Sequence, residues 1–358
     1  MTERILAAVR ELYGRYGYLP YKMSKFEEYD LYVRNKDFLI SDSVITFTDT
    51  NGKLMALKPD VTLSIIKNSR EQAGCVQKVY YSENVYRVSN AAHCFKEILQ
   101  AGLECMGDID DYHLYEVLRL AAESLRAIAP DCVLDISHLG ITEALLNNLP
   151  AENREAARVC IGEKNAHELR RLCEGCSPAV TEALCGLIST YGTPAQVLPR
   201  LKALLADVMD TAPIAQLERV LAPFAGSDLC DVLRIDCSVV GDSRYYNGLV
   251  FKGFVKGLPD SVLSGGQYDK LMQRVGRSSG AVGFAVYLDE LERLEQTAHG
   301  YDVDTLLLYE AGCDLVGLQQ AVATLAKEGS VSAQQQIPDK LTYRQLVHYK
   351  NGEVTPCV

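Results

Sequence analysis

The spacing of hydrophobic residues changes several times along the chain, and each change predicts a new element. Apolar residues recur at helical intervals over residues 3–16 and again over 110–128. Apolar and polar residues alternate through 45–60, where an Asn-Gly pair marks a hairpin turn, and through 77–107. A short helix is expected at 62–68, between these two stretches. The first third therefore predicts strands and hairpins enclosed by helices.

The middle of the chain has a different pattern. Residues 139–228 contain short segments rich in Leu and Ala, separated by Gly and Pro, and predict a helical insertion. Strand patterns return over 232–288, and residues 301–358 predict a small C-terminal α/β unit with two strands and one helix. We therefore expect an α+β fold with an antiparallel sheet flanked by helices, in a main domain over residues 1–298.

The predicted hairpin at residues 77–107 carries the first chemical hint. Gln100 and Glu104 are four residues apart on one strand, so their side chains share a face. If the hairpin is antiparallel, Arg87 can lie opposite them. An arginine facing a glutamine and a glutamate suits a zwitterion, with its carboxylate at the arginine and its ammonium at the glutamate. An ordinary polar sheet face with a cross-strand ion pair is the alternative.

The composition of the chain argues against several classes of protein. The chain has 358 residues, 48% of them hydrophobic and 23% charged, and no apolar run long enough to span a membrane. We expect a cytoplasmic protein without a signal peptide. The net charge of −11 argues against broad nucleic-acid binding. The twelve cysteines are dispersed, and the lone CxxC at Cys173 and Cys176 is weak evidence for a metal, so no metal site is predicted.

Five landmarks, in order, resemble the histidyl branch of the class II aminoacyl-tRNA synthetases. The matching segments are LKPDVT (57–62), YRVSN…ILQAGLE (86–104), RYYNGLVF (244–251), SGGQYDKL (264–271) and GFAVYLDEL (283–291). This resemblance implies a class II synthetase-like sheet and a histidine pocket. The histidine-binding residues that it implies are Asp60, Thr62, Arg87, Gln100, Glu104, Tyr245, Tyr246 and Tyr268.

The positions that handle ATP in that family differ here. Gly241 and Glu290 stand where the family has arginines, and Cys94 stands where an arginine reaches the phosphates. The loop before Cys94 is also shorter, and Ser89 replaces a glutamate. Adenylyl transfer needs positive charge at the phosphates, so we expect no adenylation, no catalytic residues and no cofactor.

A chain with the histidine residues but without the ATP residues is similar to the regulatory subunits of ATP phosphoribosyltransferase. The resemblance implies activation and histidine feedback of a short catalytic subunit in the first step of histidine biosynthesis. It also implies a homodimer within a hetero-oligomer, although Ser24 replaces the proline of the family's dimerisation motif.

Two alternatives remain open. A ligase paralogue that adenylates histidine or a related amino acid would need other cations, for which Arg244, Lys252 and Lys256 are the candidates. A sensor of uncharged tRNA would need a basic face. ATP–pyrophosphate exchange distinguishes the first alternative, and a gel shift with bulk tRNA distinguishes the second.

Overall fold

The computed structural model describes residues 2–35, 44–70, 72–89, 94–241, 245–291 and 301–356. The chain divides between Leu291 and Glu292 into two compact units, each described here by itself. The sequence-based boundary at residue 298 and the end of a helix expected over 289–296 lie outside the described residues. No helix in the described ranges is both long and apolar enough to cross a bilayer.

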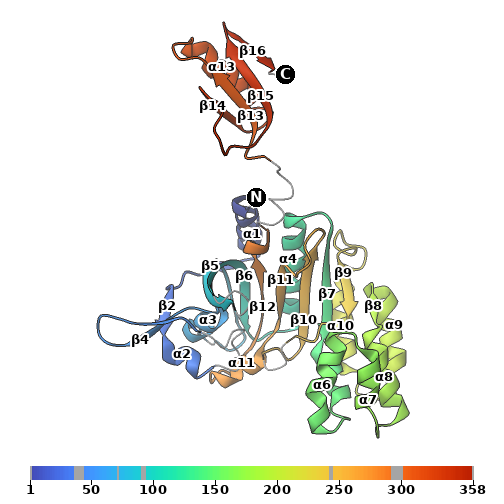
Figure 1. The fold of residues 1–358 in the computed structure, drawn as a ribbon. Coiled ribbons are helices and arrows are strands. Elements are labelled where there is room, and N and C mark those ends of the chain that lie inside the picture. The colour runs from blue at the N-terminus through green and yellow to red at the C-terminus, as the bar shows by residue number, and fades with distance from the viewer. Residues whose placement is uncertain are drawn as a thin grey trace. The chain divides into compact units, whose positions relative to one another are not determined.

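The described part of the first unit is built on a nine-stranded sheet with the order β1-β5-β6-β12-β11-β10-β7-β9-β8 (Figure 1). Neighbouring strands are antiparallel except for β1 beside β5 and β7 beside β9. The predicted antiparallel sheet flanked by helices is confirmed. Its strands are β1 (Leu19–Pro20), β5 (Val76–Ser89), β6 (Cys94–Gly107), β7 (Cys132–His138), β8 (Tyr191–Gly192), β9 (Leu233–Asp236), β10 (Leu249–Val255), β11 (Leu263–Gln267) and β12 (Gly280–Tyr287).

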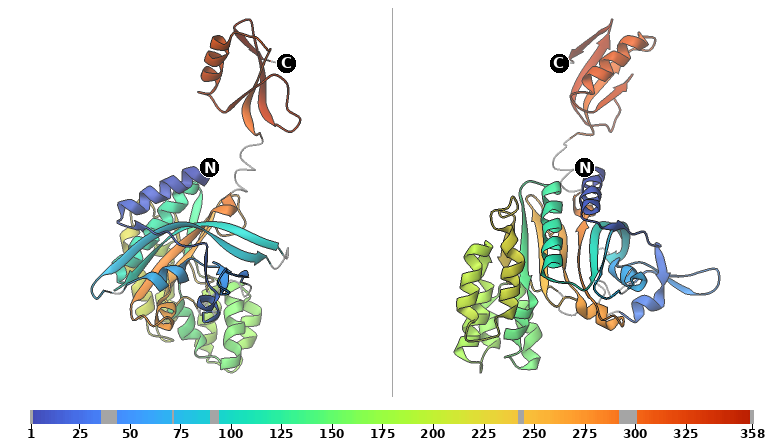
Figure 2. Two further views of the ribbon diagram at one scale, coloured as in Figure 1. Left: turned by 90° about the vertical axis from the view of Figure 1, so that its left-hand side faces the viewer. Right: turned by 180° about the vertical axis from the view of Figure 1, so that it is seen from behind.

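Two helices, α1 (Thr2–Arg15) and α4 (Asp111–Ile128), cover one face of this sheet (Figure 2). Tyr13 of α1 shares a 2.9 Å hydrogen bond with Ser124 of α4, and its ring packs against Tyr80 and Phe284 from the strands below. The Asp110 side chain accepts a hydrogen bond from the His113 amide and so fixes the start of α4. These contacts close the apolar face and leave the opposite face for the pocket.

The opposite face carries α3 (Thr62–Asn68), α11 (Asp269–Arg274) and a small sheet with the order β2-β4-β3. The strands of this sheet are β2 (Phe26–Glu28), β3 (Thr46–Thr48) and β4 (Leu54–Leu57), and α2 (Tyr29–Val33) follows β2. The Asn-Gly turn predicted between β3 and β4 is confirmed, with Gly52 at φ +81°. The observed bounds of α3 match the helix predicted at 62–68, and the β5–β6 hairpin matches the hairpin predicted at 77–107.

Residues 139–228 form the helices that the sequence predicts, plus one short strand that it does not. Strand β8 pairs antiparallel with β9, so this region also provides the sheet's last strand. The helical elements are α5 (Leu139–Leu146), α6 (Ala151–Gly162), α7 (Ala166–Leu172), α8 (Pro178–Ile188), α9 (Pro194–Leu205), α10 (Ala212–Leu221) and the 3₁₀ turn η2 (Ala222–Phe224).

The second unit has a four-stranded sheet with the order β14-β13-β15-β16 in its described residues. The predicted strand, helix and strand are β13 (Val303–Tyr309), α13 (Leu315–Leu325) and β14 (Val331–Gln334). Two further strands were not identified from the sequence: β15 (Tyr343–Lys350) and β16 (Glu353–Pro356), which form a hairpin. The core of the second unit is made by Leu307, Leu318, Val347 and Tyr349.

Candidate functional site

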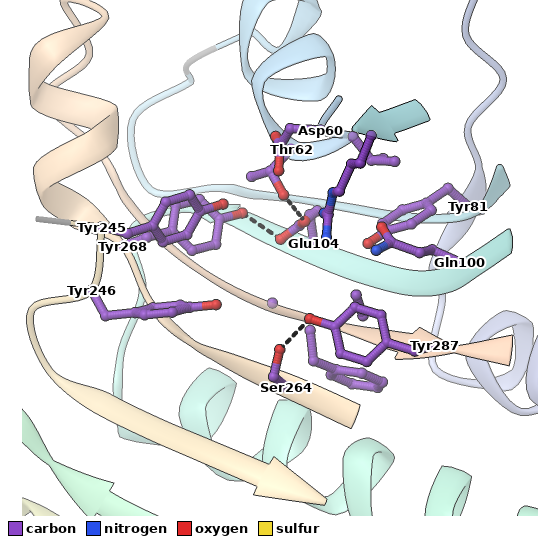
Figure 3. Close-up of a pocket in the computed structure, with 15 residues that line it drawn as sticks. Asp60, Thr62, Tyr81, Gln100, Glu104, Tyr245, Tyr246, Ser264, Tyr268 and Tyr287 are labelled. Atoms are coloured by element: carbon purple, nitrogen blue, oxygen red, sulfur yellow. Dashed lines mark hydrogen bonds between the residues drawn. The ribbon is translucent and has the colours of Figure 1, made fainter. Parts of the chain in front are cut away.

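A polar cavity lies on the face of the large sheet that α1 and α4 do not cover. It is lined by residues from the start of α3, from β5, β6, β11 and β12, and from the segment before β10 (Figure 3). All eight residues of the predicted histidine set lie in its wall. The cavity measures about 90 Å³, several times the roughly 10–15 Å³ that one water needs on the same measure.

The acidic end of the cavity is organised by the first turn of α3. Asp60 precedes the helix, and its Oδ1 accepts a 2.9 Å hydrogen bond from the Leu63 amide, which would otherwise have no partner at a helix start. Thr62 begins the helix and donates from Oγ1 to Glu104 Oε1 at 2.7 Å. The start of the short helix therefore places the Thr62 hydroxyl against Glu104 of β6, with the Asp60 carboxylate nearby in the cavity wall.

Glu104 is a buried carboxyl group at this end whose pKa is strongly raised. Its side chain is 2% exposed, and Tyr268 donates a 2.5 Å hydrogen bond to its second oxygen, Oε2. Burial raises the pKa of Glu104 to about 8, although the hydrogen bonds from Tyr268 and Thr62 oppose the rise. Burial also raises the pKa of Asp60, although the Leu63 amide and the Arg87 guanidinium oppose it. Two adjacent buried carboxyl groups make this end of the cavity favourable for a cation.

Arg87 and Gln100 stand beyond this acidic end. The predicted register was wrong in one respect: Arg87 pairs directly with Lys96, while Gln100 pairs with Glu83 and Glu104 with Val79. Arg87 nevertheless shares their face of the hairpin and reaches the cavity, where its Nε donates to the Pro59 carbonyl at 3.2 Å. Among the described residues of the hairpin, Arg87 therefore does not form the cross-strand ion pair with Glu104 that was the alternative.

Tyr245, Tyr246 and Tyr268 form an aromatic slot on another side of the cavity (Figure 3). The rings of Tyr245 and Tyr246 are 4.7 Å apart between centroids, and those of Tyr245 and Tyr268 are 5.7 Å apart. Burial raises the pKa of Tyr245 and of Tyr268 well above the ordinary value, so both hydroxyls stay neutral. Neutral phenol groups can donate or accept hydrogen bonds with a flat polar ring.

Small residues make the floor beneath these side chains. A Cβ at Gly283 would lie 1.8 Å from Glu104 Oε2, and a Cβ at Gly102 would lie 2.6 Å from the Tyr81 hydroxyl. Ala285 continues this row along β12. The cavity therefore exists because Gly102, Gly283 and Ala285 leave space on the sheet that larger residues would fill.

Three polar lining residues were missed by the sequence reasoning: Tyr81, Ser264 and Tyr287. Strand alternation could have placed Tyr81 on the same face of β5 as Arg87, since both residues have odd numbers. Alternation in GFAVY likewise puts Tyr287 on the face of Gly283 and Ala285. Ser264 could be placed in the cavity wall only once the order of the strands in the sheet was known.

The positions that lack the family's ATP residues are described in part. Gly241 has φ +51°, a conformation that an arginine rarely adopts. Cys94 is exposed at the first position of β6. The Ser89 side chain, Arg244 and residues 90–93 lie outside what the structure describes. Of the other candidate cations, Lys256 pairs with Asp131 at 3.2 Å, and Lys252 is exposed on β10.

No group of three or more His, Cys, Asp or Glu side chains suited to a metal ion occurs within the described ranges. Cys173 of the CxxC pair is buried and Cys176 is half-buried.

Comparison with known proteins agrees with the sequence motifs. The profile of the family described as histidyl-tRNA synthetase matches residues 1–291. An ATP phosphoribosyltransferase regulatory subunit from Oceanobacillus iheyensis is 25% identical over 295 residues, which cover 80% of this chain and 72% of that protein. An ATP phosphoribosyltransferase regulatory subunit/histidyl-tRNA synthetase from Bacillus halodurans has a TM-score of 0.73 at 22% identity, covering 97% of this chain and 93% of that one.

A chain of the ATP phosphoribosyl transferase complex from Thermotoga maritima has a TM-score of 0.64 at 20% identity and covers 80% of this chain and 97% of that one. These likenesses confirm the synthetase-like fold and the family that the motifs predicted. The chain belongs to the histidyl-tRNA synthetase family and, within it, resembles the regulatory subunits of ATP phosphoribosyltransferase.

Proposed function

We propose that this chain is a histidine-binding regulatory subunit of ATP phosphoribosyltransferase, acting in the cytoplasm with a short catalytic subunit. The observation that carries the proposal is the cavity itself. It combines an acidic end, an arginine–glutamine end and a tyrosine slot within one small volume. Those three parts match the ammonium, the carboxylate and the imidazole of histidine.

The proposed ligand position follows from charge. The ammonium lies at Glu104 and Asp60, with the Thr62 hydroxyl beside it, because a cation there offsets the burial that raises both pKa values. The carboxylate faces Arg87 and Gln100, which are both hydrogen-bond donors. The imidazole then lies in the tyrosine slot, which binds a flat ring by stacking and by hydroxyl contacts.

The positions that correspond to the family's ATP-contacting residues are not suited to adenylate formation. Glu290 places a carboxylate where the family has an arginine against the phosphates, and two unit charges 4 Å apart interact by about 4 kcal/mol at an effective dielectric of 20. Gly241 has the backbone conformation described above, which disfavours the family's other arginine. The proposal is therefore binding without activation of histidine.

Regulation requires that histidine and the catalytic partner bias one shared equilibrium. Feedback of tenfold to a hundredfold corresponds to a coupling free energy of about 1.4 to 2.8 kcal/mol, which is in the usual range. Coupling in binding is reciprocal. Phosphoribosyl pyrophosphate bound to the partner should therefore change the affinity for histidine by the same factor by which histidine changes the affinity for phosphoribosyl pyrophosphate.

The decisive experiment is calorimetric titration of histidine into the purified chain and into the complex that co-purifies with a short ATP phosphoribosyltransferase. Glu104→Ala should weaken histidine binding by about 2 kcal/mol or more, because the ammonium loses its buried partner. Glu97→Ala is the matched control, since Glu97 is exposed on the same strand and faces away from the cavity.

Three results would contradict the proposal. The first is no histidine binding at millimolar ligand, and the second is no catalytic partner in the native complex. The third is ATP–pyrophosphate exchange with histidine, which would support the ligase alternative instead.

A further inference from the structure

Tyr287 is the one large side chain that β12 directs toward the cavity. The other β12 residues on that face are small: Gly283 and Ala285 form the floor, and Ala281 lies farther along the strand. Tyr287 pairs across the sheet with Gln100 on β6, and its hydroxyl lies 2.5 Å from Ser264 Oγ on β11. A bridge of two hydroxyl groups therefore closes the floor beside Gln100 (Figure 3).

This bridge stands at the end of the cavity that suits a carboxylate. Gln100 is 3% exposed and lies beside Tyr287, whereas the acidic group Glu104 lies two alternations farther along β6, beyond Gly102. The hydrogen bond to Ser264 holds the phenol ring in place. A group attached to the ligand carboxylate would have to displace the ring and break this bond.

We propose that Tyr287, anchored by Ser264, selects amino acids with a free carboxylate and excludes carboxyl-extended derivatives such as esters, amides and acyl adenylates. The inference rests on the proposed histidine site and adds its specificity. Tyr287 acts through its bulk, while Ser264 is a positioning residue. A ligand that ends at its carboxylate fits in the space next to the Tyr287 ring. A ligand with a group attached to that carboxylate would clash with the ring.

The test compares the methyl and benzyl esters of L-histidine by calorimetry, with free L-histidine as the reference ligand. Both esters lack the carboxylate charge, so the ratio of their affinities reports the size of the space at that end. Overpacking a site costs on the order of 1 to 3 kcal/mol, so the wild-type protein should bind the benzyl ester roughly fivefold to 150-fold more weakly than the methyl ester.

Tyr287→Ala should reduce that ratio to within about threefold, since it removes the ring. Tyr287→Phe keeps the ring but loses the hydrogen bond to Ser264, so its affinity ratio should fall between those of the wild type and Tyr287→Ala. Ser264→Ala leaves the Tyr287 hydroxyl without its partner and should lower the ratio of ester affinities. This variant decides the question if Tyr287→Ala fails to fold.

Equal binding of the two esters by the wild-type protein, alongside normal histidine binding, would overturn this inference alone. So would a ratio that neither Tyr287→Ala nor Ser264→Ala changes. A wild-type protein that binds no histidine would overturn the proposed function, and the inference with it.

Discussion

Replacing Glu104 by glutamine should remove a pH-dependent loss of stability from the ligand-free protein. The carboxyl group is fully enclosed, and its pKa is raised from 4.5 to about 8 in the folded chain. In the unfolded chain it ionises near its ordinary value. Between those two pH values the unfolded state binds fewer protons at this group than the folded state, so the free energy of unfolding falls as pH rises.

The size of the effect follows from the width of that interval. Each pKa unit corresponds to about 1.36 kcal/mol, so the interval corresponds to on the order of 5 kcal/mol by pH 8 and about 3 kcal/mol at pH 7. The contribution of the neutral group is fully present below pH 4.5 and is lost by about pH 8. Glu104→Gln keeps a neutral, hydrogen-bonding side chain at every pH and should therefore lack this loss.

The measurement is urea denaturation of the wild-type protein and Glu104→Gln at pH 5, 6, 7 and 8. Circular dichroism is suitable because the chain contains no tryptophan. The difference in free energy of unfolding should grow in favour of Glu104→Gln from pH 5 to pH 8. Carboxyl groups distant from residue 104 titrate in both proteins and cancel in this difference. Glu97→Gln is the control and should run parallel to the wild type.

Parallel pH profiles for the wild type and Glu104→Gln would refute the reasoning, because they would mean that the folded group ionises near its ordinary pKa. Saturating histidine provides a second check. A bound ammonium favours the ionised carboxylate, so it should suppress the wild-type loss of stability at pH 7 and 8.

Further predictions concern binding, packing and assembly. Histidine binding at pH 7 should release protons, because Glu104 is largely neutral in the empty site, and titrations in buffers of different ionisation enthalpy would measure this; a buffer-independent enthalpy would contradict it. Gly283→Ala should abolish histidine binding and lower the free energy of unfolding by about 1 to 3 kcal/mol, since the new methyl group would meet Glu104 and the Leu103 carbonyl; unchanged binding would show that the floor can yield. The purified chain should sediment as a dimer at micromolar concentration, as the resemblance of its N-terminal segment to the family's dimerisation motif implies, and a monomer would refute this.

The sequence determined the elements whose signals are local. The alternation over residues 77–107 predicted a hairpin, and the structure has it as Val76–Ser89 and Cys94–Gly107. Local turn chemistry also worked at Asn51-Gly52. The same signal occurs at Asn351-Gly352, where both residues have positive φ and join β15 to β16. That hairpin was predictable from the rule already applied, and it was missed.

The site was predictable in its membership but not in its arrangement. Ordered motifs identified eight residues that line one cavity, because these residue types at these spacings are specific to one family. Register could not be read in the same way. Alternation says which side chains share a face, whereas the position of Arg87 opposite Lys96 depends on how the two strands pair along their whole length.

Only the tertiary structure decided the properties that arise from residues distant in sequence. Tyr287 and Ser264 meet because β11 and β12 are neighbours in the sheet, and Tyr268 reaches Glu104 across 164 positions of sequence. The raised pKa of Glu104 has the same origin. It depends on how completely α3, the tyrosines and the small-residue floor remove water from one carboxylate, and burial is a property of the assembled layers rather than of any segment.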